Sequence, residues 1–465
     1  MMKKIKKLLM ITFFIITFLI STPVYAEKNL SNNINLTISF KNSQIDYNII
    51  KLIKESSGKV VCESKELGTI QISCSPKLIP KLKKNYNIDS ISPTTKIKLN
   101  EDKISEFDEL NTVVGKYDLY NKYQWDIKKI TNNGKSFDLE SGTHNVVVGI
   151  IDTGVNKNHP DLKSNFLGGE NFVPKNFEGD ETENGNKEDI EDRVGHGTHT
   201  AGIIAGNGRI RGVAPNIGFK SYRVFNSNNE TNASIVASSI IKATNDGVKV
   251  INLSIGGYDF KGKCLWTDSS TGEVYELGSG MTEYDIYKRA ISYATSRGVI
   301  VVASAGNESL DCSDSSEIID YLNSQYESNG FKYIGSGFEI PGSIEGVIAV
   351  SSIGPDDKLD PSSNYGLNFI DMCAPGGNII NFEGDNYKYG MCLSSYKDSY
   401  SFKMGTSCAA PKVSAVAALI MCKYKDMNST QVIKRIYNST SDLKSDESKK
   451  YFGNGLINAY NALIK

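Results

Sequence analysis

Three short segments hold residues whose types and spacing could perform covalent catalysis. Asp152 ends the apolar run NVVVGIID, His196 opens the segment HGTHTAGIIAG, and Ser407 lies in GTSCAAP near the C-terminus. A serine hydroxyl is a weak nucleophile near neutral pH, so it needs a base that accepts its proton. A histidine can be that base when a carboxylate fixes its tautomer and stabilises the imidazolium. The three segments therefore predict a Ser–His–Asp triad and acyl-transfer chemistry.

Each of these residues alone has a simpler interpretation. An aspartate after a strand is often a turn residue, and a serine at a helix start is often an N-cap. His196 and His199 also form an H-x-x-H pair, but no Glu or Cys stands where a zinc motif needs one. We therefore interpret His199 as structural. Three segments in the order Asp, His, Ser favour the triad, because this is the chain order of subtilisin.

The segments DTG, HGTHTAG and GTSCAAP resemble the three signatures of the subtilisin-like serine proteases, the subtilases. The resemblance covers roughly residues 124–460. It implies that Asp152 orients His196, that His196 acts as general base and then acid, and that Ser407 forms the acyl-enzyme. No cofactor is then required for the chemistry.

Further site residues follow from the same resemblance. Ala305-Gly306-Asn307 matches the oxyanion-hole segment, which implies that the Asn307 side chain and the Ser407 backbone N–H stabilise the oxyanion. Ser254, Ile255 and Gly256 resemble the strand edge that binds an extended peptide substrate. Asp161, in His159-Pro160-Asp161, resembles a calcium ligand of relatives. The other ligand loop is missing here, because 203–211 run directly into GVAP, so structural calcium stays an open alternative.

The elements that must position these residues are read from the apolar pattern. Beyond residue 124, the apolar runs VKVINLSI, GVIVVASAG and GVIAVSS alternate with helix-like stretches. This pattern predicts a doubly wound α/β fold, a mainly parallel sheet with helices on both faces. Residues 34–97 read as β-α-β-β-α-β, which predicts a small ferredoxin-like α+β domain. Its role, by resemblance, is that of a prodomain that inhibits the enzyme from within the same chain.

The remaining boundaries come from composition. Residues 1–26 combine four lysines, an apolar run and VYA, which predicts a secretory signal peptide cleaved after Ala26. The predicted domains are the signal peptide 1–26, the prodomain 27–97, a cleavable linker 98–123 and the catalytic domain 124–465. We expect a secreted, extracellular protein without a stable membrane anchor. The net charge of −1 argues against a nucleic-acid surface.

Eight cysteines allow disulfides in an exported protein, although a core of this size does not need them. Cys62–Cys74, Cys264–Cys312 and Cys373–Cys392 are candidate pairs, and free thiols are an equal alternative. Cys408, beside Ser407, would make activity sensitive to thiol reagents if it were accessible. Lys412 stands where many relatives have histidine.

Two features bear on the substrate. Residues 178–192 carry eight acids just before His196; a solvated loop is the default interpretation, and a preference for basic peptides is the other. Residues 258–280 and 309–340 read as insertions whose loops would form the rim of a substrate cleft.

The segment Tyr123–Ile130 followed by TNNG resembles the start of the catalytic domain in lantibiotic leader peptidases. The resemblance implies a peptidase that removes leaders from precursor peptides. A general degradative subtilase is the alternative within the same class, and a catalytically silent binding module is the alternative outside it.

Overall fold

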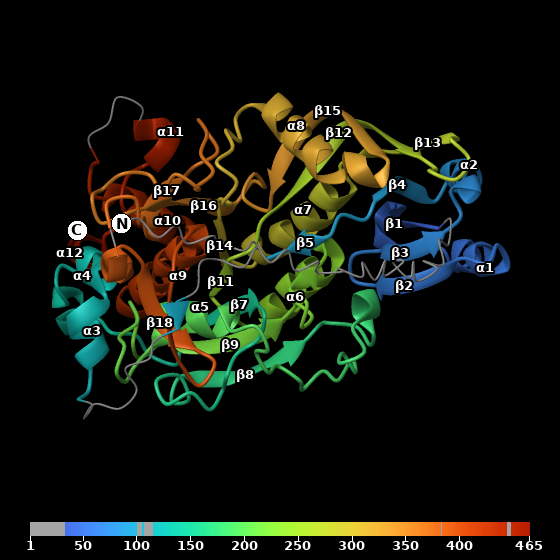
Figure 1. Cartoon of the computed structure of the whole chain (residues 1–465). Coiled ribbons are helices and arrows are strands. Elements are labelled where there is room, and N and C mark those ends of the chain that lie inside the picture. The colour runs from blue at the N-terminus through green and yellow to red at the C-terminus, as the bar shows by residue number, and fades with distance from the viewer. Residues whose placement is uncertain (1–32, 100–104, 107–114, 383, 444–447) are drawn as a thin grey trace, which may run out of the picture.

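The computed structural model describes residues 33–99, 105–106, 115–382, 384–443 and 448–465 (Figure 1). The predicted signal peptide, residues 1–26, lies outside the described residues, as does much of the predicted linker. Among the helices of the described residues, none is long and apolar enough to cross a membrane.

A seven-stranded parallel sheet forms the centre of the larger domain, in the order β17-β16-β14-β11-β7-β9-β8. The strands are β7 (Val147–Asp152), β8 (Phe166–Asn171), β9 (Gly218–Arg223), β11 (Val250–Leu253), β14 (Ile300–Ser304), β16 (Val347–Ile353) and β17 (Met372–Pro375). Because both faces are covered, the central strands β11 and β14 are buried at every position and apolar at all but one position each, Asn252 and Ser304.

Helices pack on both faces of this sheet (Figure 1). Val250 and Val302 point into an apolar core shared with α5 (His196–Ala205) and α9 (Thr406–Lys423). The alternate residues Ile251 and Val301 point into a second core, shared with α6 (Ala233–Asn245) and α7 (Thr282–Thr295). The period-two alternation of the strands thus fills two cores at once. The predicted doubly wound fold is confirmed.

The N-terminal module, residues 34–93, is a four-stranded antiparallel sheet in the order β2-β3-β1-β4. It comprises β1 (Ile34–Phe40), α1 (Tyr47–Glu55), β2 (Lys59–Ser64), β3 (Thr69–Cys74), α2 (Ile79–Lys83) and β4 (Ile88–Pro93). This is the predicted β-α-β-β-α-β arrangement. Its role as a prodomain stays a prediction.

The two expected insertions are not simple rim loops. They form a three-stranded antiparallel sheet of β12 (Gly257–Thr267), β13 (Val274–Gly280) and β15 (Phe331–Ile340), with α8 (Ser315–Tyr326) packed against β15. Phe260 and Leu277 of this insertion sheet share an apolar core with Leu36 and Ile38 of the N-terminal module. The insertion is therefore a platform on which the module rests.

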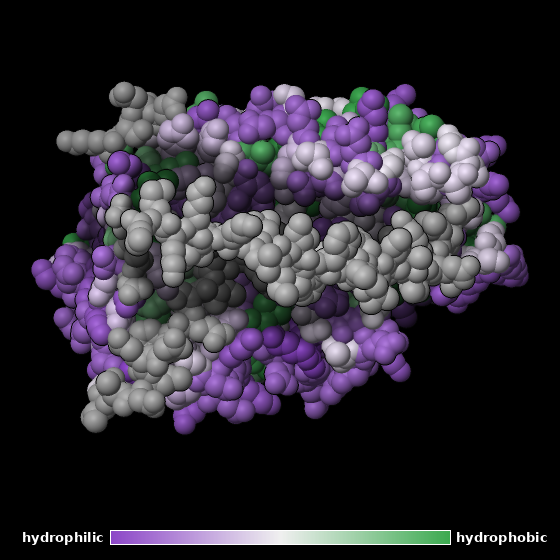
Figure 2. Space-filling view, in the orientation of Figure 1, coloured by the Kyte–Doolittle hydropathy of each residue, from purple (hydrophilic) through white to green (hydrophobic). Residues whose placement is uncertain are grey.

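The remaining elements are short or lie at the periphery. They are β5 (Ile97–Lys98), β6 (Ser105–Glu106), α3 (Asp118–Tyr123), α4 (Trp125–Ile130), β10 (Glu230–Thr231), β18 (Cys392–Tyr396), β19 (Ser399–Lys403), α10 (Ser429–Asn438), α11 (Ser448–Phe452) and α12 (Ala459–Ile464). Hydrophilic residues cover most of the described part of the face in Figure 2, as expected for a chain with mixed surface charge.

Two sequence expectations differ from the structure. Residues 118–123, assigned to the linker, form α3, whose Leu119 and Tyr123 are buried against the larger domain. All eight cysteines are free thiols, so the three candidate disulfides are not formed. For the first pair the reason is register: Cys62 lies opposite Gln71, not opposite Cys74.

A buried carboxyl group holds the segment that leaves the N-terminal module. Glu283, at the start of α7, is 1 % exposed and accepts a hydrogen bond from the Thr95 backbone N–H at 3.0 Å and another from the Thr95 hydroxyl. Burial, and next the charge of Asp259, raises the pKa of Glu283 to about 8 from an ordinary 4.5. In a chain cut so that the module can dissociate, Glu283 would gain water and its pKa would return toward the ordinary value.

We expect the module to bind less tightly as the pH rises. The bound form holds an extra proton between the two pKa values, so affinity is greatest below about 4.5 and falls as the pH approaches about 8. The test uses the Ser407→Ala variant, cut at a protease site engineered into 107–114. The dissociation constant of the cut module from the rest of the chain should rise by up to about tenfold per pH unit between these two pKa values. Glu283→Gln should flatten the profile; an unchanged slope in that variant would refute the assignment.

Candidate active site

The Asp152 carboxylate lies at the end of β7, the strand between β11 and β9, and is completely buried. It accepts hydrogen bonds from the Thr153 N–H at 2.7 Å and from the Thr200 hydroxyl at 3.2 Å. His196, the first residue of α5, places Nδ1 2.7 Å from Asp152 Oδ1. Because a carboxylate can only accept, Nδ1 carries the proton and Nε2 is left as the acceptor.

The loop before His196 is held by a second carboxylate that the sequence analysis placed in a solvated acidic stretch. Asp192 is 6 % exposed and accepts hydrogen bonds from the Thr153 hydroxyl at 2.8 Å, the Gly195 N–H at 2.6 Å and the Thr198 N–H at 2.7 Å. It thereby joins the strand that ends in Asp152 to the helix that begins at His196. The solvated interpretation is wrong for this residue.

Ser407 is the second residue of α9 and is 8 % exposed. Its hydroxyl donates to the Ser254 carbonyl at 3.4 Å, and the Ser254 hydroxyl donates to the Ser407 carbonyl at 3.0 Å. Within the described part of the chain, no hydrogen bond joins Ser407 Oγ to His196. The Ser407 hydroxyl is thus bonded to the segment that contains Ser254 and not to His196. Catalytic hydrogen bonds are often long or unformed in enzymes without substrate.

Asn307 follows β14 and has a fixed amide orientation. Its Oδ1 accepts hydrogen bonds from the Thr406 N–H and the Thr406 hydroxyl, both at 2.9 Å. The Nδ2 group is consequently left as a donor beside the start of α9. The Ser407 N–H lies in the first turn of that helix, where backbone N–H groups lack intrahelical acceptors. Two donors can therefore serve one oxyanion.

The segment Ser254, Ile255 and Gly256 continues from β11 toward β12. The position of a Cβ at Gly256 would be 3.9 Å from the Gly306 Cα, so the space beside Gly256 is bounded by the turn that carries Asn307. All the predicted triad, oxyanion and substrate residues therefore meet at the carboxyl edge of the sheet, where ligands of such folds bind.

Residues 143–455 match the model of the subtilase family, peptidase S8. The chain belongs to this family. Being a subtilase, it is a serine endopeptidase.

Similar proteins include two that process antimicrobial peptides. The epidermin leader peptide-processing serine protease EpiP of Staphylococcus epidermidis is 33% identical over 97% of this chain and 98% of its own length. The nisin leader peptide-processing serine protease NisP of Lactococcus lactis subsp. lactis is 38% identical over 78% of this chain and 53% of its own. The crystal structure of EpiP from Staphylococcus aureus matches with a TM-score of 0.75 at 33% identity, covering 93% of this chain and 98% of that one. The likeness to leader peptidases drawn from the sequence is confirmed.

One polar residue of this subtilase, Glu339, was not predicted from the sequence. It lies in β15 and is fully buried. Within the described chain neither carboxyl oxygen makes a hydrogen bond of good geometry, although the backbone N–H groups of Gly342 and Ser343 lie close enough to lower its pKa in part. A Cβ at Gly256 would lie 3.3 Å from its Oε1, so the carboxyl group faces the space between Gly256 and Gly306. Burial, and next the charge of Glu308, raises the pKa of Glu339 well above its ordinary value.

The neighbouring Glu308 is different, because its carboxylate is already satisfied. It accepts hydrogen bonds from the Asn307 N–H at 2.8 Å, from Asn364 Nδ2 at 3.0 Å and from the Tyr258 hydroxyl. Glu308 thus stabilises the turn, whereas the carboxyl group of Glu339 lies beside Gly256. A signal for Glu339 existed in the sequence: it occupies a buried-face position in the alternating strand FKYIGSGFEI.

The surroundings of Asp161 do not fit a calcium cage. Calcium takes roughly six to eight oxygen ligands, whereas Asp161 Oδ2 accepts the Ile210 N–H at 2.9 Å and Gly208 packs directly against Oδ1. Among the described residues, no group of three or more His, Cys, Asp or Glu side chains could hold a metal ion. His199 Nε2 lies 3.1 Å from the Ser401 carbonyl, in a structural contact.

Lys412 and Cys408 belong to the interior of this subtilase. Lys412 is fully buried, donates to the Cys408 carbonyl at 2.9 Å and pairs with Asp126 at 2.8 Å. Cys408 is 2 % exposed, which favours a packing role. The lysine thereby joins α9 to α4 through a buried ion pair.

Thr406→Val should lower kcat by about tenfold with little change in KM, because it removes the hydroxyl that orients Asn307. The same hydroxyl accepts the Gly306 N–H at 3.2 Å, so the turn loosens as well. Thr406→Ser keeps the hydroxyl and should retain most of the activity. Steady-state kinetics on one peptide separate the two variants. Equal losses in both would contradict the assigned role of the hydroxyl, because Thr406→Ser keeps it.

Proposed function

We propose that this subtilase is a secreted processing protease that removes the leader from a lantibiotic-type precursor peptide by cutting after a basic residue. The names of EpiP and NisP support the substrate class. The single observation that carries the cleavage preference is the buried, unpartnered carboxyl group of Glu339 beside Gly256.

In the proposed reaction, His196 Nε2 takes the Ser407 proton while Oγ attacks the carbonyl carbon of the scissile bond. The oxygen that becomes negative is stabilised by Asn307 Nδ2 and the Ser407 N–H. The imidazolium, stabilised by Asp152, then protonates the leaving amine. Water, activated by the same imidazole, hydrolyses the acyl-enzyme and restores the serine.

Glu339 supports selection by charge. A buried carboxyl group without a partner is costly, and a guanidinium or ammonium entering beside it would supply both a charge and hydrogen bonds. An aromatic or aliphatic side chain would leave the carboxyl group unsatisfied. A general degradative subtilase has no need of such a group, which favours the processing role over it.

The position of the chain that leaves the N-terminal module supports the proposal that the uncut protein is a zymogen. After β4 its chain runs past Gly257 and pairs with β10, close to the segment that contacts Ser407. We infer that residues 27–97 act as an intramolecular inhibitor, that the chain is cut within 98–123, and that the signal peptide directs export.

Glu339→Gln tests the cleavage preference. For a peptide with arginine before the cut bond, kcat/KM should fall by about a hundredfold, because losing one partner of a buried charge pair costs about 2–5 kcal/mol. The matched peptide with methionine at that position should change little. Glu276→Gln, which alters a half-exposed acid on β13, is the control. Wild-type enzyme that cuts both peptides equally would instead indicate a degradative protease.

A further inference from the structure

The segment that follows β4 lies along the catalytic domain as an extended strand. β5 pairs antiparallel with β10, with Lys98 opposite Glu230, and the Leu99 N–H donates to the Asn229 carbonyl at 3.1 Å. Ile97 is 4 % exposed and belongs to the core beside α6 and α7. Its Cγ1 lies 3.2 Å from where a Cβ of Gly257 would stand. This is the edge on which a peptide substrate would add a strand.

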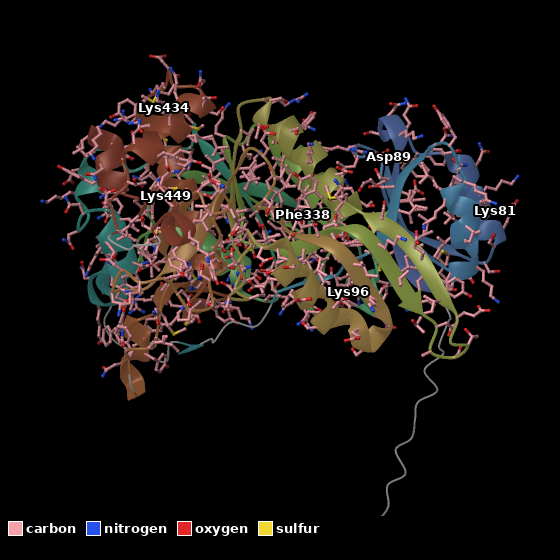
Figure 3. All side chains as sticks on the ribbon, turned by 90° about the horizontal axis from the view of Figure 1, so that it is seen from above. Lys81, Asp89, Lys96, Phe338, Lys434 and Lys449 are labelled. Atoms are coloured by element: carbon pink, nitrogen blue, oxygen red, sulfur yellow. The ribbon has the colours of Figure 1, made fainter. Side chains whose placement is uncertain are left out.

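Lys96, next to this strand, meets two carboxylates of the larger domain. Its Nζ lies 2.7 Å from Glu178 Oε2 and 3.6 Å from Glu230 Oε1. The two glutamate side chains are only 17% and 18% exposed. In Figure 3, Lys96 lies apart from Lys81, which marks the outer end of the N-terminal module.

These carboxylates depend on the segment for their cation. Across the described residues, no other Lys or Arg lies within ion-pair distance of Glu178 or Glu230. The groove beside them is lined by Lys98, Leu99 and 227–229 as well as by the two glutamates. Once the segment departs, Glu178 and Glu230 lose the chain that covers them and face the groove without a counter-charge.

We propose that Glu178 and Glu230 form an outer subsite for a basic side chain of the substrate, several residues before the cut bond, and that Lys96 occupies this subsite in the uncut chain. The proposal rests on the proposed function and deepens it. Backbone pairing with β10 is blind to sequence, so side-chain pockets must supply the selectivity. An aliphatic substrate residue would bind where Ile97 now packs, and this fixes the register of the substrate strand. Glu178 and Glu230 would then bind a basic residue directly before that aliphatic residue.

The test uses a series of peptides that differ only in the position of one lysine. Each peptide has the same arginine before the cut bond, the same aliphatic residue upstream, and lysine or alanine at one of the successive upstream positions. For processed wild-type enzyme, lysine at the position directly before the aliphatic residue should raise kcat/KM by about three- to tenfold, mainly through KM. The gain should shrink as salt is added.

The Glu178→Gln/Glu230→Gln double variant should lose this gain and keep its activity on the alanine peptides. Glu273→Gln/Glu276→Gln, directly before β13 and on it, makes the same charge change elsewhere and should keep the gain. A gain that survives in the first double variant, or that is absent at every position in wild type, would overturn the subsite. Failure to cut after arginine in any peptide would instead overturn the proposed function.

Discussion

The His196 imidazole lies 2.7 Å from a carboxylate that is completely buried at the end of a central strand. A parallel sheet makes this contact achievable, because all its strands end at one edge and the helices that return from it begin there. Asp152 and the segment after β11 come from strand ends, whereas His196 and Ser407 come from helix starts. Further hydrogen bonds hold the remaining site residues at this edge. Asp192 accepts bonds that fix the loop before His196, and Thr406 donates the bonds that fix Asn307.

Several acidic side chains lie around this edge of the sheet, and they differ in whether they have a partner. Glu339 is buried without a partner, whereas Glu308 is fully bonded and Glu178 and Glu230 are bonded to a lysine of the same chain. Desolvated acids are costly unless a cation or donor meets them. This distribution separates Glu308, which stabilises the site, from Glu339, Glu178 and Glu230, which we propose bind basic side chains of the substrate.

The features that could be predicted from the sequence are those that depend on residues close together in the chain. The strand that ends in Asp152 and the helices that begin at His196 and Ser407 follow from apolar pattern and motif, and the order of the N-terminal module follows from its alternation. Glu339 was missed because its role depends on a contact with Gly256, more than eighty residues earlier in the chain. The insertion sheet was missed for a similar reason: β12 pairs with β15 over a long separation, and loops and strands look alike in such stretches. Whether Cys62 and Cys74 pair stayed open because the sequence does not reveal the register of a hairpin whose strands shift by a bulge.

The most direct measurement is active-site labelling of the processed protein with a fluorophosphonate, followed by peptide mass spectrometry. A serine that a histidine–aspartate couple activates displaces fluoride and retains the phosphonyl group. We predict one label, on Ser407, and labelling slower by roughly a thousandfold or more in His196→Ala. Processed wild-type protein that takes no label on Ser407 would contradict the account and leave a binding module with the shape of a protease.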